Sequence, residues 1–187
     1  MRINISNIAN LPTKYGNFKI QSFREGAKEH LVIFNEPLGI TPTVRIHSEC
    51  LTGDTIGSLK CDCGDQLQFA LKTIGEKGGM VIYLRQEGRD IGLLNKVNAY
   101  ALQDAGYNTV EANHQLGFEA DARNYEIVKI ILHHFKIKSI KLLTNNPKKL
   151  NSLKGIEIVQ RIPIIIEPNK YNEGYLKTKK EEMGHLL

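Results

Sequence analysis

All three cysteines of this 187-residue chain, Cys50, Cys61 and Cys63, lie within fourteen consecutive residues. An odd number of thiols cannot be fully paired, and cysteines separated by one residue do not bridge each other comfortably. Three thiolates that converge on one point would instead bind a tetrahedral zinc ion and leave its fourth position open. That arrangement is typical of a catalytic rather than a structural zinc site.

The alternative interpretation is that the three thiols carry no metal and are buried in the core. Polar residues and a glycine flank the Cys-x-Cys pair, which favours a loop. His47 is a candidate fourth ligand, but on a strand it would point to the same side as Glu49 and away from Cys50. Zinc lowers the pKa of a bound water to roughly 7 in favourable sites, and the negative charge of three thiolates opposes that shift.

The composition is ordinary for a globular protein, with 41% hydrophobic and 24% charged residues. No apolar run is long enough to span a membrane, and residues 1–4 do not begin a signal peptide. We therefore expect a cytoplasmic protein, since a reducing compartment also suits thiolate ligands. The net charge of +5 fits either a solvated basic surface or the attraction of an anionic ligand.

The hydrophobic pattern predicts an α/β fold. After an irregular segment at residues 1–13, alternation at 18–22 and apolar runs at 31–34 and 44–47 indicate a small antiparallel N-terminal strand region. Beyond the cysteines, helical spacing alternates with apolar strands. We expect helices at 67–74, 93–102 and about 122–135, and strands at 80–84, 140–143 and, once or twice, within 156–166.

This alternation predicts three layers, a mixed sheet with helices on both faces. We expect residues 1–187 to form a single domain that ends in a charged helical tail from about residue 172.

Two polar loops follow predicted strands. The loop at 85–92 contains glycine and two arginines, Arg85 and Arg89, so its backbone N–H and guanidinium groups suit an anion. The loop at 144–149 would use Thr144 for hydrogen bonding and Lys149 for a phosphate contact. Loops at the carboxyl ends of strands commonly line ligand crevices. The alternatives are a solvated connection with local ion pairs and a simple Asn-Asn-Pro turn.

Four further residues have both a structural and a functional interpretation. Asp121 is either the N-cap of the following helix or a catalytic group. Asp121 and Arg123 would not share a helix face, so they can act together only in a non-helical turn. Tyr100 could simply pack on an amphipathic helix, and His114 is either a polar loop residue or a general acid–base.

Taken together, five segments resemble the GTP cyclohydrolase II family in its free-standing form. They are VRIHSECLTG (44–53), CDCG (61–64), RQEGRDIG (85–92), NHQLG (113–117) and TNNPKK (144–149). The resemblance covers nearly the whole chain. It implies a zinc enzyme of riboflavin biosynthesis that acts on GTP, opens the imidazole ring, and releases formate and pyrophosphate. The implied product is 2,5-diamino-6-ribosylamino-pyrimidinone 5′-phosphate.

The resemblance also implies roles for individual residues. The three cysteines would hold zinc, Arg123 would be a nucleophile with Asp121 as proton acceptor, and Tyr100 would lie near the reacting base. The implied GTP contacts are Arg45, Ile46, His47, Ser48, Glu49, Gln66, Glu87, Gly88, Arg89, Thr109, Thr144 and Lys149. A guanidinium keeps its proton at ordinary pH, so a phosphate clamp is the alternative role of Arg123. Magnesium on the triphosphate and a homodimer are also implied.

Other functions fit parts of the sequence. His47 and Glu49 ahead of the cysteines have some similarity to zinc nucleobase deaminases, but the cysteine spacing differs and no proline precedes the pair. A zinc-stabilised nucleic-acid-binding module would suit the positive charge, but no basic stripe with interleaved aromatic residues is present. We therefore expect neither a nucleic-acid nor a membrane partner. A family variant that releases pyrophosphate without opening the ring is a third alternative.

Overall fold

The computed structural model of the chain describes residues 2–119 and 121–187. Within these residues, eight strands form one sheet in the order β1-β3-β4-β6-β5-β7-β8, with β2 paired to β3. The strands are β1 (Ile3–Ile5), β2 (Ala9–Thr13), β3 (Gly16–Glu25), β4 (Lys28–Phe34), β5 (Thr43–Ser48), β6 (Met80–Leu84), β7 (Ser139–Leu143) and β8 (Glu157–Ile162). The helices are α1 (Leu51–Asp54), α2 (Cys63–Lys77), α3 (Glu87–Asp90), α4 (Gly92–Asp104), α5 (Thr109–Gln115), α6 (Glu126–His134), α7 (Pro147–Ser152) and α8 (Glu173–Glu181).

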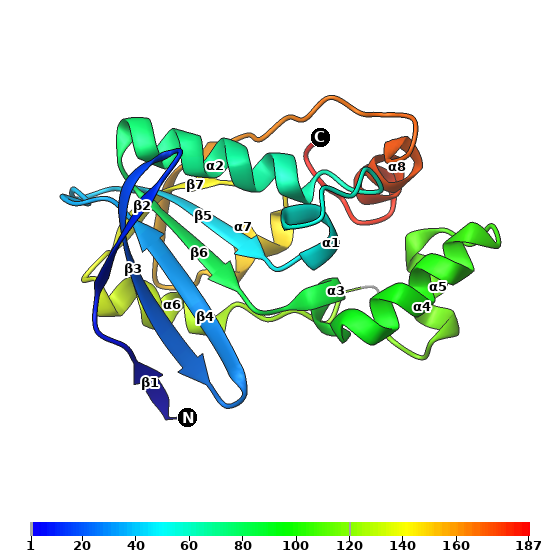
Figure 1. The fold of residues 1–187 in the computed structure, drawn as a ribbon, viewed down its shortest axis with the longest axis horizontal. Helices are drawn as coiled ribbons and strands as arrows, with labels where there is room; N and C mark the ends of the chain where they lie inside the picture. Colours follow the sequence, from blue (N-terminus) through cyan, green and yellow to red (C-terminus); the bar gives the residue numbers. More distant parts are fainter. Residues whose placement is uncertain (1, 120) are drawn as a thin grey trace.

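The sheet has a parallel and an antiparallel half (Figure 1). β5 lies between β6 and β7 and is parallel to both, and β8 is parallel to β7. On the other side, β4 is antiparallel to β6 and β3 is antiparallel to β4. The predicted antiparallel N-terminal region is confirmed for β3 and β4. The strand expected at 44–47 is β5, however, and it belongs to the parallel half.

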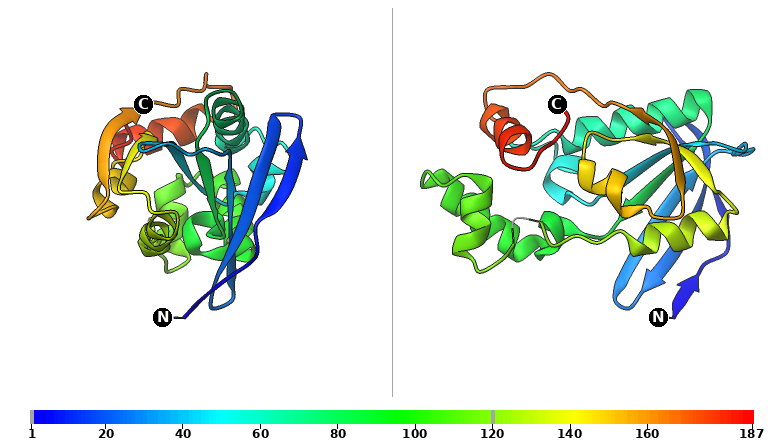
Figure 2. Two further views of the ribbon diagram at one scale, coloured as in Figure 1. Left: turned by 90° about the vertical axis from the view of Figure 1, so that its left-hand side faces the viewer. Right: turned by 180° about the vertical axis from the view of Figure 1, so that it is seen from behind.

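Helices cover both faces of the sheet, which confirms the predicted three-layer α/β architecture (Figure 2). On one face, Ala70 and Ile74 of α2 pack in a cluster with Val81 of β6. On the other face, Ile131 of α6 packs in a cluster with Ile82 of β6. Neighbouring residues of β6 thus serve opposite cores, because side chains alternate along a strand.

The N-terminal residues differ from expectation. The segment 1–13 was predicted to be irregular, but β1 and β2 both pair with β3. Most side chains of β2 are exposed, so neither face of this strand needs to be apolar. Its sequence therefore lacks the alternation of apolar and polar residues that predicts a strand. Pro12 lies in β2, which pairs on one side with β3, and such an edge position tolerates a residue without an N–H group.

The helix boundaries also differ in part. α6 begins at Glu126 rather than near 122, so Asp121 is not its N-cap. α5 and α7 were not predicted, because helices of seven and six residues are too short to show periodicity. The expected helical tail is α8, and a single strand, β8, lies within 156–166. No helix in the described part of the chain is long and apolar enough to cross a membrane.

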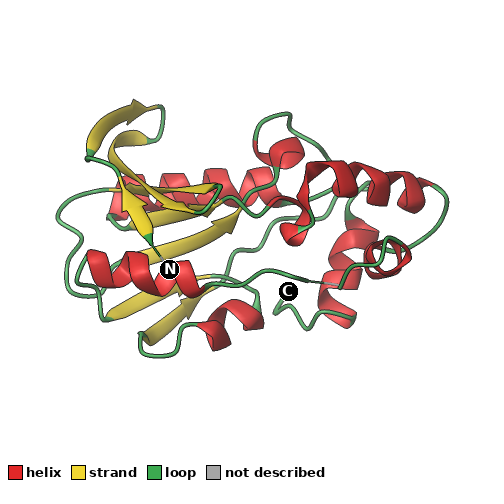
Figure 3. Ribbon diagram, turned by 90° about the horizontal axis from the view of Figure 1, so that it is seen from below, coloured by secondary structure: helices red, strands yellow, loops and turns green. Residues whose placement is uncertain are grey.

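The helix predicted at 93–102 is α4, but three of its larger apolar side chains do not face a core. Leu93, Leu94 and Val97 are 41%, 76% and 53% exposed, whereas Lys96 and Ala99 are buried. Figure 3 shows helices gathered beyond one end of the sheet, where no strand faces them, and Figure 1 places α4 and α5 there. The periodicity identified the helix but not the face that it buries.

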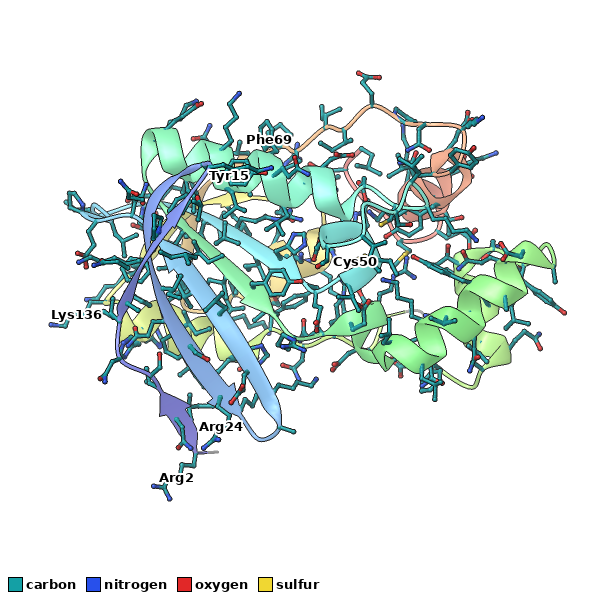
Figure 4. The ribbon with its side chains drawn as sticks, viewed as in Figure 1. Arg2, Tyr15, Arg24, Cys50, Phe69 and Lys136 are labelled. Atoms are coloured by element: carbon teal, nitrogen blue, oxygen red, sulfur yellow. The ribbon has the colours of Figure 1, made fainter. Side chains whose placement is uncertain are left out.

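Gly75 of α2 lies against the turn at Tyr15, between β2 and β3 (Figure 4). A Cβ atom on Gly75 would lie 2.1 Å from the Tyr15 carbonyl oxygen. We predict that Gly75→Ala lowers the free energy of unfolding by about 1–3 kcal/mol, because the backbone must move. Alanine's better helix propensity, worth about 1 kcal/mol, would not offset this.

Gly174→Ala on α8 is the matched control, since nothing lies within 4 Å of its Cβ position. Its stability should stay the same or rise. Urea unfolding followed by circular dichroism measures both variants, and equal stabilities would contradict the close packing of α2.

Candidate active site

The carboxyl ends of β5, β6 and β7 point to the same edge of the sheet (Figure 1). The chain leaves these strands into polar segments at 48–50, 85–87 and 144–146, respectively. Because β5 is hydrogen-bonded to both neighbours, the three segments meet at one place. Residues from all three segments and from α4, α5 and α8 line a single cleft.

The three cysteines meet on the wall of this cleft (Figure 4 labels Cys50). Cys50 lies two residues after β5, Cys61 lies two residues before α2, and Cys63 is the first residue of α2. The sulfur atoms of Cys50 and Cys61 are 3.7 Å apart, and all three sulfurs lie within 4.8 Å of one another. Two thiolates on a tetrahedral zinc would be about 3.8 Å apart, so the donor set fits this metal.

His47 is held away from the cysteines by Asp54. Its Nε2 atom lies 3.0 Å from Asp54 Oδ1, and the side chain is almost fully buried. The other oxygen of Asp54 accepts hydrogen bonds from the Cys50 backbone N–H at 3.0 Å and the Tyr83 hydroxyl at 2.8 Å. Burial lowers the pKa of His47. Asp54, which the sequence did not single out, therefore orients both β5 and the first cysteine.

The cleft carries a high concentration of positive charge. Among the described residues, seven lysines and arginines line it against two glutamates: Arg45, Lys60, Arg89, Lys96, Arg123, Lys149 and Lys179, against Glu49 and Glu87. Burial lowers the pKa of Lys149, and the charges of Arg45, Arg123 and Lys179 lower it further. An anion would relieve this repulsion, so the cleft suits a polyphosphate.

Neutral acceptors hold two of these cations. Arg45 donates to Gln66 Oε1 at 2.6 Å and to the Leu143 carbonyl at 3.2 Å. Lys149 donates to the Ile46 carbonyl at 2.8 Å. Burial lowers the pKa of Arg45 to about 10. Within the described residues, neither side chain forms a salt bridge with a carboxylate, so an anionic ligand would supply the missing counter-charge and favour the protonated form of both.

Asp121 and Arg123 form a bidentate ion pair in the non-helical segment before α6. Arg123 Nε donates to Oδ1 and Nη2 to Oδ2, each at 2.8 Å. Burial alone would raise the pKa of Asp121, but hydrogen bonds and charge from Arg123 hold it at about 2. Burial alone would lower the pKa of Arg123, but Asp121 raises it. Both groups are therefore ionised, and Arg123 Nη1 lies 3.4 Å from Ser48 Oγ.

The chain matches the family described as GTP cyclohydrolase II over residues 4–163. It belongs to the GTP cyclohydrolase II family. It is 66% identical over 187 residues to the GTP cyclohydrolase-2 of Campylobacter hominis and 67% identical over 190 residues to that of Campylobacter fetus subsp. fetus. Both alignments cover 100% of this chain and 97% of the relative.

The GTP cyclohydrolase-2 of Helicobacter pylori strain P12 is 55% identical over 190 residues, which cover 100% of this chain and 99% of that protein. The family is one of hydrolases, so this chain is an enzyme of that class.

Most residues that the family resemblance implied as GTP contacts line the cleft: Arg45, His47, Ser48, Glu49, Gln66, Glu87, Gly88, Arg89, Thr109, Thr144 and Lys149. Tyr100 and Arg123 also line it, whereas Asp121 reaches it through Arg123. The side chain of Ile46 is fully buried in the core between β5 and α6, so only its backbone can contact a ligand.

Two residues considered for the site lie elsewhere. Arg85, expected as an anion donor, is exposed and pairs with Glu49 at 2.9 Å. His114 is exposed and lies on α5 rather than in a loop, while its neighbour Asn113 is buried and lines the cleft.

The C-terminal segment contributes to the cleft, although no pattern in its sequence predicts this. Tyr175, Lys179, Met183 and His185 all line it. Lys179 donates to Asp62 Oδ1 at 2.6 Å across a separation of 117 residues. A contact between residues so far apart in the chain produces no pattern in the neighbouring sequence. The sequence of α8 shows only the charged residues that are typical of a surface helix.

Gly53 allows α1 to approach the cysteines. A Cβ atom on it would lie 2.8 Å from Cys61 Sγ and 3.1 Å from Cys50 Sγ. We predict that Gly53→Ala lowers the metal affinity of the three-thiol group about 10- to 100-fold without removing a ligand, because the sulfurs must separate. Competition with a chromogenic chelator measures this. Thr55→Ala, at an exposed position just after α1, is the control, and unchanged affinity in Gly53→Ala would contradict the packing described.

Proposed function

We propose that this protein hydrolyses GTP, opens the imidazole ring of guanine and releases formate and pyrophosphate. The product would be 2,5-diamino-6-ribosylamino-pyrimidinone 5′-phosphate, formed in the first step of riboflavin biosynthesis. One observation carries the proposal: in a chain of the GTP cyclohydrolase II family, a single cleft joins a three-thiol group to a set of buried cations. The thiols suit metal chemistry at the base, and the cations suit the phosphates.

We propose zinc as the metal, held by Cys50, Cys61 and Cys63. Bound zinc supplies a Lewis acid that activates water for attack on an electron-poor carbon. Tyr100 is proposed to lie beside the reacting base. Its hydroxyl is 3.4 Å from Thr52 Oγ1, which is itself 3.8 Å from Cys50 Sγ, so the ring lies next to the metal ligands.

We propose that the phosphates lie against Lys149, Arg45 and Arg123. The first two have no carboxylate partner among the described ion pairs, so their charge would be neutralised by the ligand. Thr144, which is buried beside them, is proposed as a further hydrogen-bonding group. Magnesium is proposed to accompany the triphosphate, because this ion commonly binds through substrate phosphates with few protein ligands.

Arg123 has two candidate roles. As a clamp it would stay protonated and bind the phosphate next to the ribose, a role that its raised pKa favours. As a nucleophile it would lose a proton to Asp121, whose Oδ2 atom already accepts a hydrogen bond from Nη2 at 2.8 Å. The ion-pair geometry serves both roles.

The central experiment incubates the purified chain with GTP and magnesium and measures formate and pyrophosphate together. We predict that both are released, and that a zinc chelator or Cys61→Ser abolishes formate release because the metal is lost. Full formate release by metal-free Cys61→Ser would contradict the zinc chemistry. Ammonia in place of formate would instead indicate a deaminase.

For Arg123, we predict that Arg123→Ala lowers pyrophosphate release about 100- to 1000-fold, since either role is lost. Arg24→Ala, an exposed arginine far from Cys50 in Figure 4, controls for the change of charge. Mass spectrometry of acid-quenched enzyme distinguishes the roles. A nucleotidyl adduct on Arg123 of the wild type supports the nucleophile, and an adduct that persists in Arg123→Ala excludes it.

We also propose a homodimer in the cytoplasm. The exposed apolar residues Leu93, Leu94 and Val97 on α4 support a subunit interface, because such a cluster is costly to leave in water. Three neighbouring free thiols, which we propose to bind a metal, support a reducing compartment. A solution mass of one chain by light scattering at micromolar concentration would contradict the dimer.

A further inference from the structure

Lys96 is a buried lysine to which neither the family resemblance nor the proposed reaction gives a role. It lies in the middle of α4 and is 7% exposed. Its Nζ atom is 3.1 Å from Cys50 Sγ and 2.8 Å from Glu87 Oε1. A lysine is rarely buried unless its charge is matched, and here one of its two partners is a sulfur of the metal group.

The surroundings hold the Lys96 ammonium against that sulfur. Glu87 Oε2 accepts the Leu51 backbone N–H at 2.6 Å, so the carboxylate that anchors Lys96 is itself fixed. Gly88 leaves space for the lysine stem, since a Cβ atom there would lie 3.1 Å from Lys96 Cβ. The Tyr100 ring lies 5.7 Å from Nζ on the cleft side. The ammonium is therefore oriented from several directions.

Lys96 has an ionic partner despite its burial. Its Nζ atom forms an ion pair with Glu87 Oε1 at 2.8 Å, and the two side chains are 9% and 8% exposed. An ammonium that donates to a thiolate is a charge-assisted hydrogen bond, and this kind is stronger than a neutral one.

Three thiolates around a divalent cation leave a net charge of −1, which weakens the metal as a Lewis acid. A hydrogen bond to one sulfur draws electron density away from the metal, and groups beyond the ligands tune metal sites in this way. We propose that Lys96 is a positioning residue of the metal centre: it donates to the metal-bound sulfur of Cys50, offsets the surplus negative charge and so preserves the activating power of the metal. The inference rests on the proposed zinc centre.

The test replaces zinc with cobalt(II), whose sulfur-to-metal charge-transfer band reports the electron density on the thiolates. Without the hydrogen bond the sulfur electrons are held less tightly, so Lys96→Met should move this band to longer wavelength. In the zinc enzyme, kcat for formate release should fall about 10- to 100-fold. KM for GTP should change less than about twofold, because Lys96 acts through the sulfur rather than on the substrate. Asn98→Met, an exposed position on the same helix, is the control.

Lys96→Met leaves Glu87 buried without its cation, which could unfold the chain. The double variant Lys96→Met with Glu87→Gln removes that charge as well, and Glu87→Gln alone is its reference. The same band shift between these two proteins would support the proposal. A band that stays in place in both comparisons would overturn it and leave Lys96 a purely structural role. A wild-type protein with no thiolate band at all would overturn the zinc centre itself.

Discussion

β5 is hydrogen-bonded in parallel to β6 on one side and to β7 on the other, and the cleft depends on this pairing. Parallel strands end at the same edge, so three segments far apart in sequence are brought together by the pairing of the strands that they follow. The first carries Cys50, the second Glu87 and the third Thr144. The two cores on either face of β6 keep this edge in place, because a shift of one residue would move each side chain of β6 into the opposite core, which is packed around different side chains.

The buried cations of the cleft depend on partners that offset the cost of burying their charge. Each buried cation would be costly alone, and the protein matches them with carboxylates, thiols or backbone carbonyls. Lys179 pairs with Asp62, Lys96 pairs with Glu87 and Cys50, and Lys149 has a carbonyl. The kind of partner that each cation has matters for function. A cation matched by a carboxylate is held in place by it, whereas one matched only by a carbonyl has no counter-charge until an anionic ligand binds.

Much of the fold could be predicted because its central elements follow simple periods. β6 is an uninterrupted apolar run and α2 repeats at helical spacing, so both were found. Asn108 and Glu111 form a capping box at the start of α5, but this signal alone does not predict the helix, because seven residues are too few to show a helical period. The helical spacing predicts a start of α6 near residue 122, but the helix begins at Glu126. Asp121 and Arg123, two residues apart, form an ion pair that a helix would not allow, and no local pattern reveals such a pair.

By itself the sequence determined the chemical groups: three cysteines spaced for a metal, polar loops after strands, and segments that resemble one enzyme family. These are local patterns, since ligand type and loop composition can be recognised within a few residues. Only the tertiary structure decided which charges stand together. It brought Lys96 to Cys50 and Lys179 to Asp62 across 46 and 117 residues. The energy of a buried charge depends on what surrounds it in space, and periodicity along the chain does not record those surroundings.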